Sequence, residues 1–348
     1  MNRKHLTVLV ILGLFIISCK KSDFLIDRIE TFIGFKKPDN FPEPVYDFTL
    51  NKITNAGFDL GKSLFYEVRL SRNNTISCGS CHIQSSAFTQ HGHDVSHGID
   101  DRLGTRNSPP IMNLAWSKAF NWDGGVPHLD LQPIVPITTH EEMDENLPNV
   151  FAKLQAMPKY RSMFKAAFGT EEITTSNFMK ALSQFMLMCV SSNSKYDKVM
   201  RNEENTSFTE EELEGYNIFK GKCASCHSEP LFTDGSFRNN GLVPNAVNDL
   251  GQYTATLNET DKYKFKVPSL RNLRYTAPFM HDGRFLTLNG VLEHYNSEVS
   301  NMVNLDPLLN KGAKPGITLS EREKSRLTAF LFTLNDETFI NNKLLAEQ

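Results

Sequence analysis

Apolar residues recur at helical spacing over much of this chain. The stretches 53–65, 150–199 and 319–334 carry this period, and the first of them spans about three turns of helix. We find no alternating apolar and polar run long enough to require a large sheet. The pattern therefore predicts a mainly α fold with long loops between the helices.

The best-marked helix start lies at Thr209, because Glu212 stands three residues later and completes a capping box. Beyond this box, Leu213, Tyr216 and Phe219 fall on one helical face. We expect a helix that begins at the box and leads to Cys223.

Several short motifs occur twice, which predicts an internal duplication. The matched stretches are 61–65 with 215–219, 88–90 with 232–234, and 113–124 with 272–283. Within the last pair, Trp122 stands where the other copy has His281. We expect two related domains, at 49–203 and 204–348, that do different jobs.

Length and charge narrow the class of protein. A chain of 348 residues suits two domains of ordinary size, each able to bury a core. The net charge is -3 and the pI is about 6.4, whereas a phosphate-binding surface needs a basic excess. We therefore expect a soluble globular protein without a nucleic-acid partner.

The N-terminus predicts export. Arg3 and Lys4 precede an apolar run at 6–17, and the residues before Cys19 resemble a lipoprotein cleavage motif. The alternatives are a plain secretory signal or a membrane anchor, but the run is short for a span. We expect a lipoprotein signal peptide at 1–18, a lipid anchor on Cys19, and a tether and lead-in at 19–48.

Four of the six cysteines lie in two Cys-x-x-Cys-His runs, 78–82 and 223–227. Cysteines three apart share one face of a helical turn, where both can take up the vinyl groups of a haem, and the next histidine can ligate the iron. Paired zinc knuckles, the rival, usually lie about 15 to 20 residues apart, far closer than these runs. The residues predicted to hold two c-type haems are Cys78, Cys81, His82, Cys223, Cys226 and His227. Cys189, in the apolar stretch 185–190, should be an inert core thiol.

Several further motifs occur in combination. They are Arg-Asn-Ser-Pro at 106–109, Trp-Asp-Gly at 122–124 with Gln132, Pro136 and Glu-Met at 142–143, Val-Pro-Ser-Leu-Arg-Asn at 267–272, and Thr-Ala-Pro-Phe-Met-His-Asp-Gly at 276–283. With them, the chain from about Asn55 onward resembles the bacterial diheme cytochrome c peroxidase family, which also contains MauG of methylamine utilisation. The resemblance implies two cytochrome-c-like domains. Peroxide would react at the N-terminal haem, and electrons would enter through the C-terminal one.

The resemblance also implies roles for single residues. His82 would be the proximal ligand of the peroxidatic haem, Glu142 its distal acid-base residue, and Gln132 an amide of the same pocket. Breaking an O–O bond needs a group that takes a proton from one oxygen and returns it to the other, which a carboxylate can do. Trp122 would lie between the two haems and relay electrons. A bridging Ca²⁺ would take oxygen ligands from Asn107, Thr276 and Pro278.

Two positions depart from the family pattern. The distal histidine of the peroxidases corresponds to His97, but its distance to Asn107 is about two residues longer, and His91 and His93 lie nearby. Whether the enzyme needs reductive activation therefore stays open.

The second departure concerns the ligand opposite His227. Tyr295 stands where the peroxidases have Met and where MauG has Tyr, and a phenolate would lower the reduction potential relative to Met. Met280 and Met302 are the alternatives.

The leading hypothesis is a periplasmic, lipid-anchored peroxidase that reduces H₂O₂ to water with electrons from a small cytochrome c or cupredoxin. The alternatives are a MauG-like oxidase that acts on residues of a partner protein, and a non-enzymatic diheme electron carrier. A homodimer is also expected from the resemblance.

Overall fold

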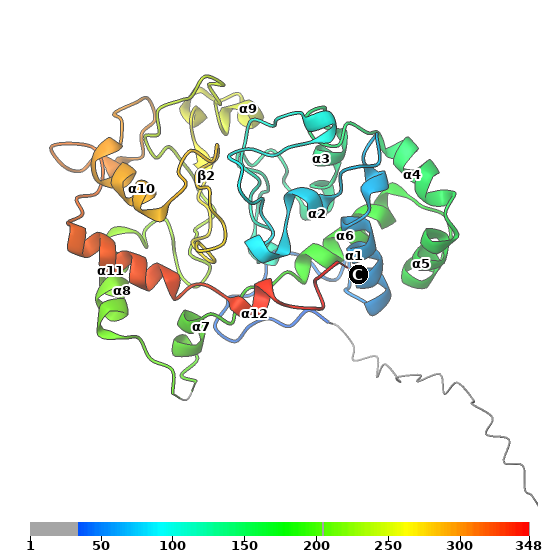
Figure 1. The fold of residues 1–348 in the computed structure, drawn as a ribbon, viewed down its shortest axis with the longest axis horizontal. Helices are drawn as coiled ribbons and strands as arrows, with labels where there is room; N and C mark the ends of the chain where they lie inside the picture. The colour runs from blue at the N-terminus through cyan, green and yellow to red at the C-terminus, as the bar shows by residue number, and fades with distance from the viewer. Residues whose placement is uncertain (1–33, 204, 348) are drawn as a thin grey trace, which may run out of the picture. The chain divides into compact units, whose positions relative to one another are not determined.

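The structure is a computed structural model that describes residues 34–203 and 205–347 (Figure 1). In this part of the chain the only sheet is an antiparallel pair of two-residue strands, β1 (Phe237–Arg238) and β2 (Phe265–Lys266). The prediction of a mainly α fold is therefore confirmed. The signal peptide and Cys19 lie outside the described residues, among which no helix is long and apolar enough to cross a membrane.

The helices are mostly short and are separated by long loops. The α-helices are α1 (Asn55–Phe65), α2 (Cys78–Cys81), α3 (Ile134–Thr138), α4 (Leu147–Gln155), α5 (Pro158–Phe168), α6 (Thr175–Leu187), α7 (Lys195–Met200), α8 (Glu210–Lys222), α9 (Tyr253–Thr256), α10 (Leu288–Glu293), α11 (Glu321–Phe332) and α12 (Glu337–Ile340). The 3₁₀ turns are Val68–Leu70, Gln84–Ser86, Ile99–Asp101, Leu114–Trp116, Leu129–Leu131, Glu259–Asp261 and Pro307–Leu309, and His294–Glu298 is a π-helical turn.

Helices α1 and α6 cross closely on the right of Figure 1. The side chain of Thr54 caps α1 by accepting from the N–H of Gly57 (3.0 Å). At the crossing, a Cβ on Gly61 would lie 1.9 Å from the carbonyl oxygen of Ala181, so only glycine permits this approach. The predicted helix at 53–65 is thus present, and its position depends on one glycine.

Helices α8 and α11 cross in the same way on the left of Figure 1. The capping box of Thr209 and Glu212 begins α8 as predicted, and a Cβ on Gly215 would lie 1.9 Å from the carbonyl oxygen of Arg326. Phe219 is fully buried, but Leu213 is 48% exposed. The face that carries Leu213, Tyr216 and Phe219 is therefore buried only toward Phe219.

The stretch 150–199 is not one helix but parts of four, α4 to α7. Pro158 begins α5, and Gly169, at φ 77°, ends it in a left-handed conformation. The apolar period survives these breaks because α4, α5 and α6 pack their apolar faces into one cluster of buried side chains, whereas Tyr196 of α7 belongs to a second cluster.

The buried apolar side chains form two clusters. One runs from Phe41 to Cys189, and the other from Tyr196 to Leu334. The end of the chain reads as a polar tail in the sequence, yet Phe339 and Leu345 are buried in the first cluster. The C-terminal segment therefore returns from the second cluster to close the first.

Candidate haem sites

Both Cys-x-x-Cys-His runs close the same helical turn. In the first run the N–H of His82 donates to the carbonyl of Cys78 (2.9 Å), and in the second the N–H of His227 donates to that of Cys223 (3.0 Å). This bond fixes the spacing of the two sulfurs and the histidine. Each run therefore presents its three groups as haem attachment requires.

Each histidine is held through one ring nitrogen. His82 Nδ1 lies 2.8 Å from the carbonyl oxygen of Phe88, and His227 Nδ1 lies 3.2 Å from that of Phe232 and 3.1 Å from that of Pro268. A histidine that donates Nδ1–H to a carbonyl keeps Nε2 for a metal. Burial lowers the pKa of both imidazoles, which keeps them neutral as a ligand must be.

The four motif thiols are kept protonated by burial. Burial raises the pKa of Cys78 to about 12, of Cys81 to about 11 and of Cys223 to about 12, and it also raises that of Cys226. Among the described residues, no three His, Cys, Asp or Glu side chains are arranged to hold a metal. The geometry thus lacks the converging thiolates of a zinc site.

The second run opens into a cavity of about 200 Å³. Most of its wall is apolar, from Leu270, Leu273, Phe279, Leu288, Val291, Leu292, Leu309, Ile317, Leu319, Leu327 and Leu331. Cys223, Cys226 and His227 lie on one part of this wall. An apolar cavity with two thiols and a neutral imidazole fits the haem that the motif predicts.

Tyr295 lines the same cavity from the π-helical turn that extends α10. Burial raises its pKa to about 12, so the phenolate form requires a neighbouring cation. Met280 also lines the cavity, and Asn240 contacts both candidates: its Nδ2 lies 3.5 Å from the sulfur of Met280, and its side chain hydrogen-bonds Tyr295. Met302 is not among the residues that line this cavity.

Glu142 lies beside the first run. Its carboxylate is close enough to Cys78 and Cys81 to raise the pKa of both thiols. The N–H of Ile99 donates to the carbonyl of Glu142 (2.8 Å), which ties this turn to the loop after His97. Burial, and to a smaller extent the charge of Glu141, raises the pKa of Glu142. A carboxylate whose pKa is raised accepts and releases a proton at a higher pH than an ordinary one, which suits general acid-base chemistry.

Gln132 precedes the short helix α3, which carries the chain toward Glu142. The backbone of Gln132 closes one turn by donating to Leu129 (3.0 Å), and the N–H of Met143 returns to the carbonyl of Pro136 (3.2 Å). These two bonds order the backbone at the two ends of the segment that joins Gln132 to Glu142, and a common pocket for their side chains stays a prediction.

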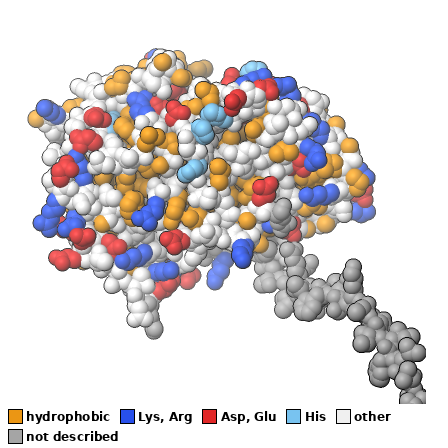
Figure 2. Space-filling model, in the orientation of Figure 1, with side chains coloured by type: hydrophobic (Ala, Val, Ile, Leu, Met, Phe, Trp, Pro, Cys, Tyr) orange, Lys and Arg blue, Asp and Glu red, His pale blue; other side chains and the backbone are white. Residues whose placement is uncertain are grey.

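The loop at 91–102 carries the candidate distal histidines. His97 contributes its backbone to the first run, because the sulfur of Cys81 lies 3.7 Å from its carbonyl oxygen. Its ring lies against that of His93, tilted by 46° with centroids 4.4 Å apart, and its Nδ1 lies 3.4 Å from Asp101. His91 and His93 are exposed. Figure 2 shows histidine side chains gathered among apolar ones on the face that it draws.

Trp122 contacts residues of both the first region, 49–203, and the second region, 204–348. It is buried, lines the cavity of the second run and donates Nε1–H to the carbonyl of Asn107 (2.8 Å). Its own carbonyl accepts from the N–H of Lys266 (2.8 Å). His281, at the matching position, is also buried and stacks on Phe265 at 3.7 Å.

Comparison with known proteins identifies the family. Residues 55–205 match the family model described as "Di-haem cytochrome c peroxidase". The chain is 37% identical to the methylamine utilization protein MauG of Methylorubrum extorquens, over 87% of this chain and 84% of that protein. It is 34% identical to the cytochrome c551 peroxidase of Nitrosomonas europaea, over 85% of each chain. The chain belongs to the di-haem cytochrome c peroxidase family.

A solved structure agrees with this assignment. The crystal structure of "a MauG-like protein associated with microbial copper homeostasis" superimposes with a TM-score of 0.80 at 30% identity, over 90% of this chain and 99% of that one. Membership of a di-haem cytochrome c peroxidase family implies two c-type haems and an oxidoreductase that acts on peroxide. The two histidines with Nδ1 held by carbonyls, the paired thiols and the apolar cavity fit those groups.

The calcium ligands predicted for a di-haem peroxidase lie together. Asn107, Thr276 and Pro278 all line the cavity of the second run, and the N–H of Asn107 donates to the carbonyl of His281 (2.7 Å). Amide, hydroxyl and carbonyl oxygens are ligands that Ca²⁺ prefers. A bridging calcium at these residues stays a prediction for this member of the family.

Sequence reasoning missed two kinds of residue in this chain. Phe88 and Phe232 hold the histidines through backbone carbonyls, in left-handed conformations with φ of 59° and 56°. Their repeated Phe-Thr motif was the available signal. Asn240, which touches both candidate ligands, follows another Asn in a loop and carries no signal of its role.

Proposed function

We propose that this chain is an exported, periplasm-facing peroxidase that reduces H₂O₂ to water with electrons from a small cytochrome c or cupredoxin. The observation that carries the proposal is the half-buried carboxylate of Glu142, which lies close enough to Cys78 and Cys81 to raise the pKa of both thiols and whose own pKa is raised. A mere electron carrier has no need of a proton-exchanging group at that position. This favours an enzyme over the third hypothesis.

The reaction consumes two protons and two electrons, H₂O₂ + 2H⁺ + 2e⁻ → 2H₂O. A haem held by Cys78, Cys81 and His82 would supply the iron at which the O–O bond is broken. The ionised carboxylate of Glu142 takes the proton from one peroxide oxygen and returns it to the other, which leaves as water. Because Glu142 ends the step ionised again, one carboxylate suffices.

The electrons would pass from the second region to the first beside Trp122. The indole lines the cavity of His227 and bonds Asn107 of the first region, so it provides an aromatic bridge between them. The neutral imidazole of His227 keeps the C-terminal haem in place as the electron store.

The decisive variant is Glu142→Gln, with Glu141→Gln as its matched control. The control removes an exposed carboxylate one residue away and should turn over as the wild type does. Glu142→Gln should lower steady-state H₂O₂ turnover with a reduced donor by about 10²- to 10⁴-fold, with both haems retained. Equal turnover of Glu142→Gln and wild type would refute the proposal.

A second candidate function is oxidation of residues on a partner protein, and Tyr295 favours it. This side chain lines the cavity of the second run, and the MauG relative shares 37% identity with the chain. Visible and EPR spectra of the oxidised protein distinguish the candidates. The partner-protein reaction is supported if the His/Tyr spectral signature is lost in Tyr295→Phe but kept in Met280→Leu. A near-infrared Met-to-iron band in the wild type counts against it.

Three further properties belong to the same proposal. We expect calcium at Asn107, Thr276 and Pro278, a lipid anchor at Cys19 and origin of the two haem regions by duplication. The matched glycine crossings of Gly61 and Gly215 support the last of these. Metal analysis after chelation, and mass spectrometry of the mature N-terminus, test the first two.

A further inference from the structure

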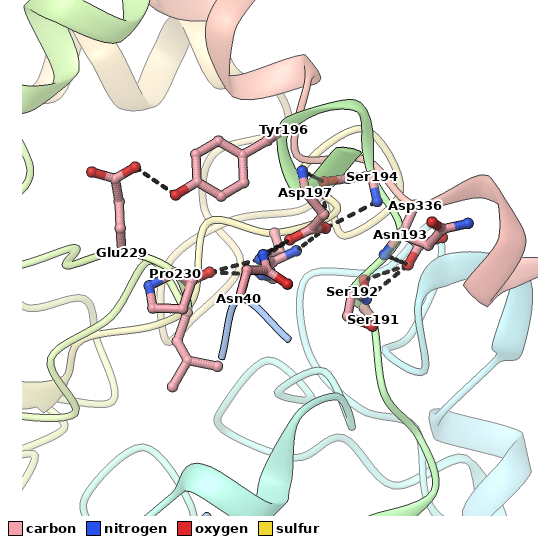
Figure 3. Close-up of polar contacts among 12 residues, drawn as sticks. Asn40, Ser191, Ser192, Asn193, Ser194, Tyr196, Asp197, Glu229, Pro230 and Asp336 are labelled. Carbon is pink, nitrogen blue, oxygen red and sulfur yellow. Dashed lines mark hydrogen bonds and ion pairs between the residues drawn. The ribbon is translucent and has the colours of Figure 1, made fainter. Parts of the chain in front are cut away.

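A fully buried ion pair joins α7 to the segment that follows β2. The side chains of Asp197 and Arg271 are both 0% exposed, and two parallel bonds of 2.8 Å connect them. A bidentate pair of this kind has a fixed geometry as well as a charge interaction. Figure 3 shows Asp197 in this polar network.

Hydrogen bonds satisfy the rest of the pair. Asp197 also accepts from Asn40 (2.9 Å) and from the N–H and hydroxyl of Ser194 (3.0 and 2.7 Å). Arg271 donates from Nε and Nη2 to the carbonyl of Pro230 (3.0 and 2.7 Å). Tyr196 beside this network bonds Glu229 (2.6 Å), next to Pro230 in the chain (Figure 3).

Stability alone does not explain such a pair. Removing two charges from water is costly, and apolar residues of similar volume often replace a buried ion pair without loss of stability. The aromatic rings of Phe41 and Phe232 already lie 4.9 and 5.6 Å from the guanidinium carbon. An apolar pair would leave the N–H of Ser194 and the carbonyl of Pro230 without these partners, so the distinctive contribution of the ion pair is the geometry that it imposes on the polar groups around it.

Hydrogen bonds connect the ion pair to the two segments that contact His227. The segment 230–232 is bonded to the segment 267–271 at three successive residues: Arg271 donates to Pro230, Ser269 Oγ to Leu231 (2.6 Å), and the N–H of Leu270 to Phe232 (3.3 Å). These two segments supply both carbonyls that face His227 Nδ1. The ion pair thus fixes the two segments, 230–232 and 267–271, whose carbonyls contact the imidazole of His227.

The first region lacks this anchor. Counting back from the matched Asn113 and Asn272, Met112 stands at the position of Arg271. The neighbouring contact is the same, since the N–H of Ile111 donates to Phe88 (3.0 Å) as Leu270 does to Phe232. His82 Nδ1 is bonded to one carbonyl, whereas His227 Nδ1 faces two.

We propose that Asp197 and Arg271 are positioning residues for His227, which set the reduction potential of the C-terminal haem without affecting the N-terminal one. The inference rests on the proposed haem at His227. Acceptors on Nδ1–H make a ligating imidazole more basic and thereby favour oxidised iron. When the segments 230–232 and 267–271 are no longer held together, the hydrogen bonds from Nδ1–H of His227 to their carbonyls weaken. The reduction potential of the C-terminal haem therefore rises.

The test variant is the double substitution Asp197→Leu with Arg271→Met, which removes both charges and copies Met112. Its net charge equals that of the wild type, so a change in potential comes through His227 and not from an added charge. Lys195→Met is the matched control, because it breaks the ion pair of the same helix with Glu212, away from the 230–232 segment. Spectroelectrochemical titration and EPR of the holoprotein report each haem separately.

We expect the C-terminal potential to rise in the double variant, with its EPR signal shifted, while the N-terminal haem and the Lys195→Met protein stay at wild-type values. Arg271→Lys, which keeps the charge but loses the planar fork, should give a smaller rise and decides the matter if the double variant does not accumulate. Unchanged C-terminal potentials, or equal shifts of both haems, overturn the inference. A wild type that binds two haems but does not turn over H₂O₂ would refute the proposed function alone.

Discussion

The two Cys-x-x-Cys-His regions share one backbone arrangement around their motifs, called the frame below. They differ in the side chains that surround it. Each closes a helical turn on its first cysteine, and each holds its histidine by the carbonyl of a left-handed phenylalanine, Phe88 or Phe232. Each then reaches an asparagine with positive φ, Asn113 at 56° or Asn272 at 64°. The shared features all serve to place a histidine and two thiols.

The differences lie on the groups that face a haem. The first region has Glu142 beside its thiols, and the second has Tyr295 and Met280 around its cavity. A carboxylate exchanges protons, whereas a phenol or thioether is suited to ligate iron. Under the proposed function, the comparison assigns proton transfer to the first region and electron storage to the second.

The largest effect should come from removing either pair of thiols. We expect Cys78→Ala with Cys81→Ala to retain one haem and to lose peroxide turnover completely, because the carboxylate of Glu142 then lies beside no iron. The second pair, Cys223→Ala with Cys226→Ala, should also retain one haem but still respond to peroxide. Pyridine haemochrome assays measure the haem, and stopped-flow spectra measure the response.

These two variants would break the comparison if they behaved alike. A peroxide response lost in both, or retained only without the second pair, would mean that the proton-handling site is not confined to the first region.

The pH dependence should be the next largest effect. The pKa of Glu142 is raised by burial, so the carboxylate becomes protonated at a higher pH than an ordinary one. Only the ionised form can accept the proton of peroxide, so kcat/KM should fall about tenfold per pH unit below this pKa. Initial rates across a pH series measure this limb.

The same series on Glu142→Gln provides the control. The acid limb should disappear, while reduction of the C-terminal haem by its donor keeps the pH dependence of the wild type. Persistence of the limb in this variant would assign it to another group.

Local patterns in the sequence predicted the frame well. The capping box at Thr209, the apolar period of 53–65 and the buried Cys189 all appear in the structure, because each depends on residues close in the chain. Contacts between distant residues were not predictable in this way. Asp197 meets Arg271 across 74 residues, and Phe339 returns to a core that begins at Phe41.

The site was predictable to a similar extent. The motif cysteines and histidines could be named from their spacing, and Glu142 only from the resemblance. The choice between Tyr295 and Met280 could not be made, since both line one cavity and the loop residue Asn240 contacts both. Such a choice depends on the packing of three segments.

The helix crossings should show a smaller effect, on stability. Gly61→Ala and Gly215→Ala each drive a Cβ against a backbone carbonyl oxygen at 1.9 Å, so each should cost about 1–3 kcal/mol. Gly221→Ala, in the same α8 helix but with nothing within 4 Å, should instead stabilise by up to about 1 kcal/mol. Guanidinium unfolding followed by circular dichroism measures all three.

A similar loss of unfolding free energy at Gly61 and Gly215 would sharpen the comparison, because it would show that the two helix crossings contribute equally to stability. A loss at only one of these glycines would mean that the two crossings have the same geometry but contribute differently to stability.

The smallest effect is expected at Leu213. Two residues before the matched glycines, the first region has Asp59 and the second has Leu213, whose side chain is 48% exposed. Because it does not reach the core, Leu213→Asp should change the free energy of unfolding by no more than about 0.5 kcal/mol. Phe219→Ala, on the buried side of the same helix, should cost about 3–5 kcal/mol. A large loss at Leu213 would place this residue in a contact with a partner or a second copy, and the two helices would then differ in function as well as in sequence.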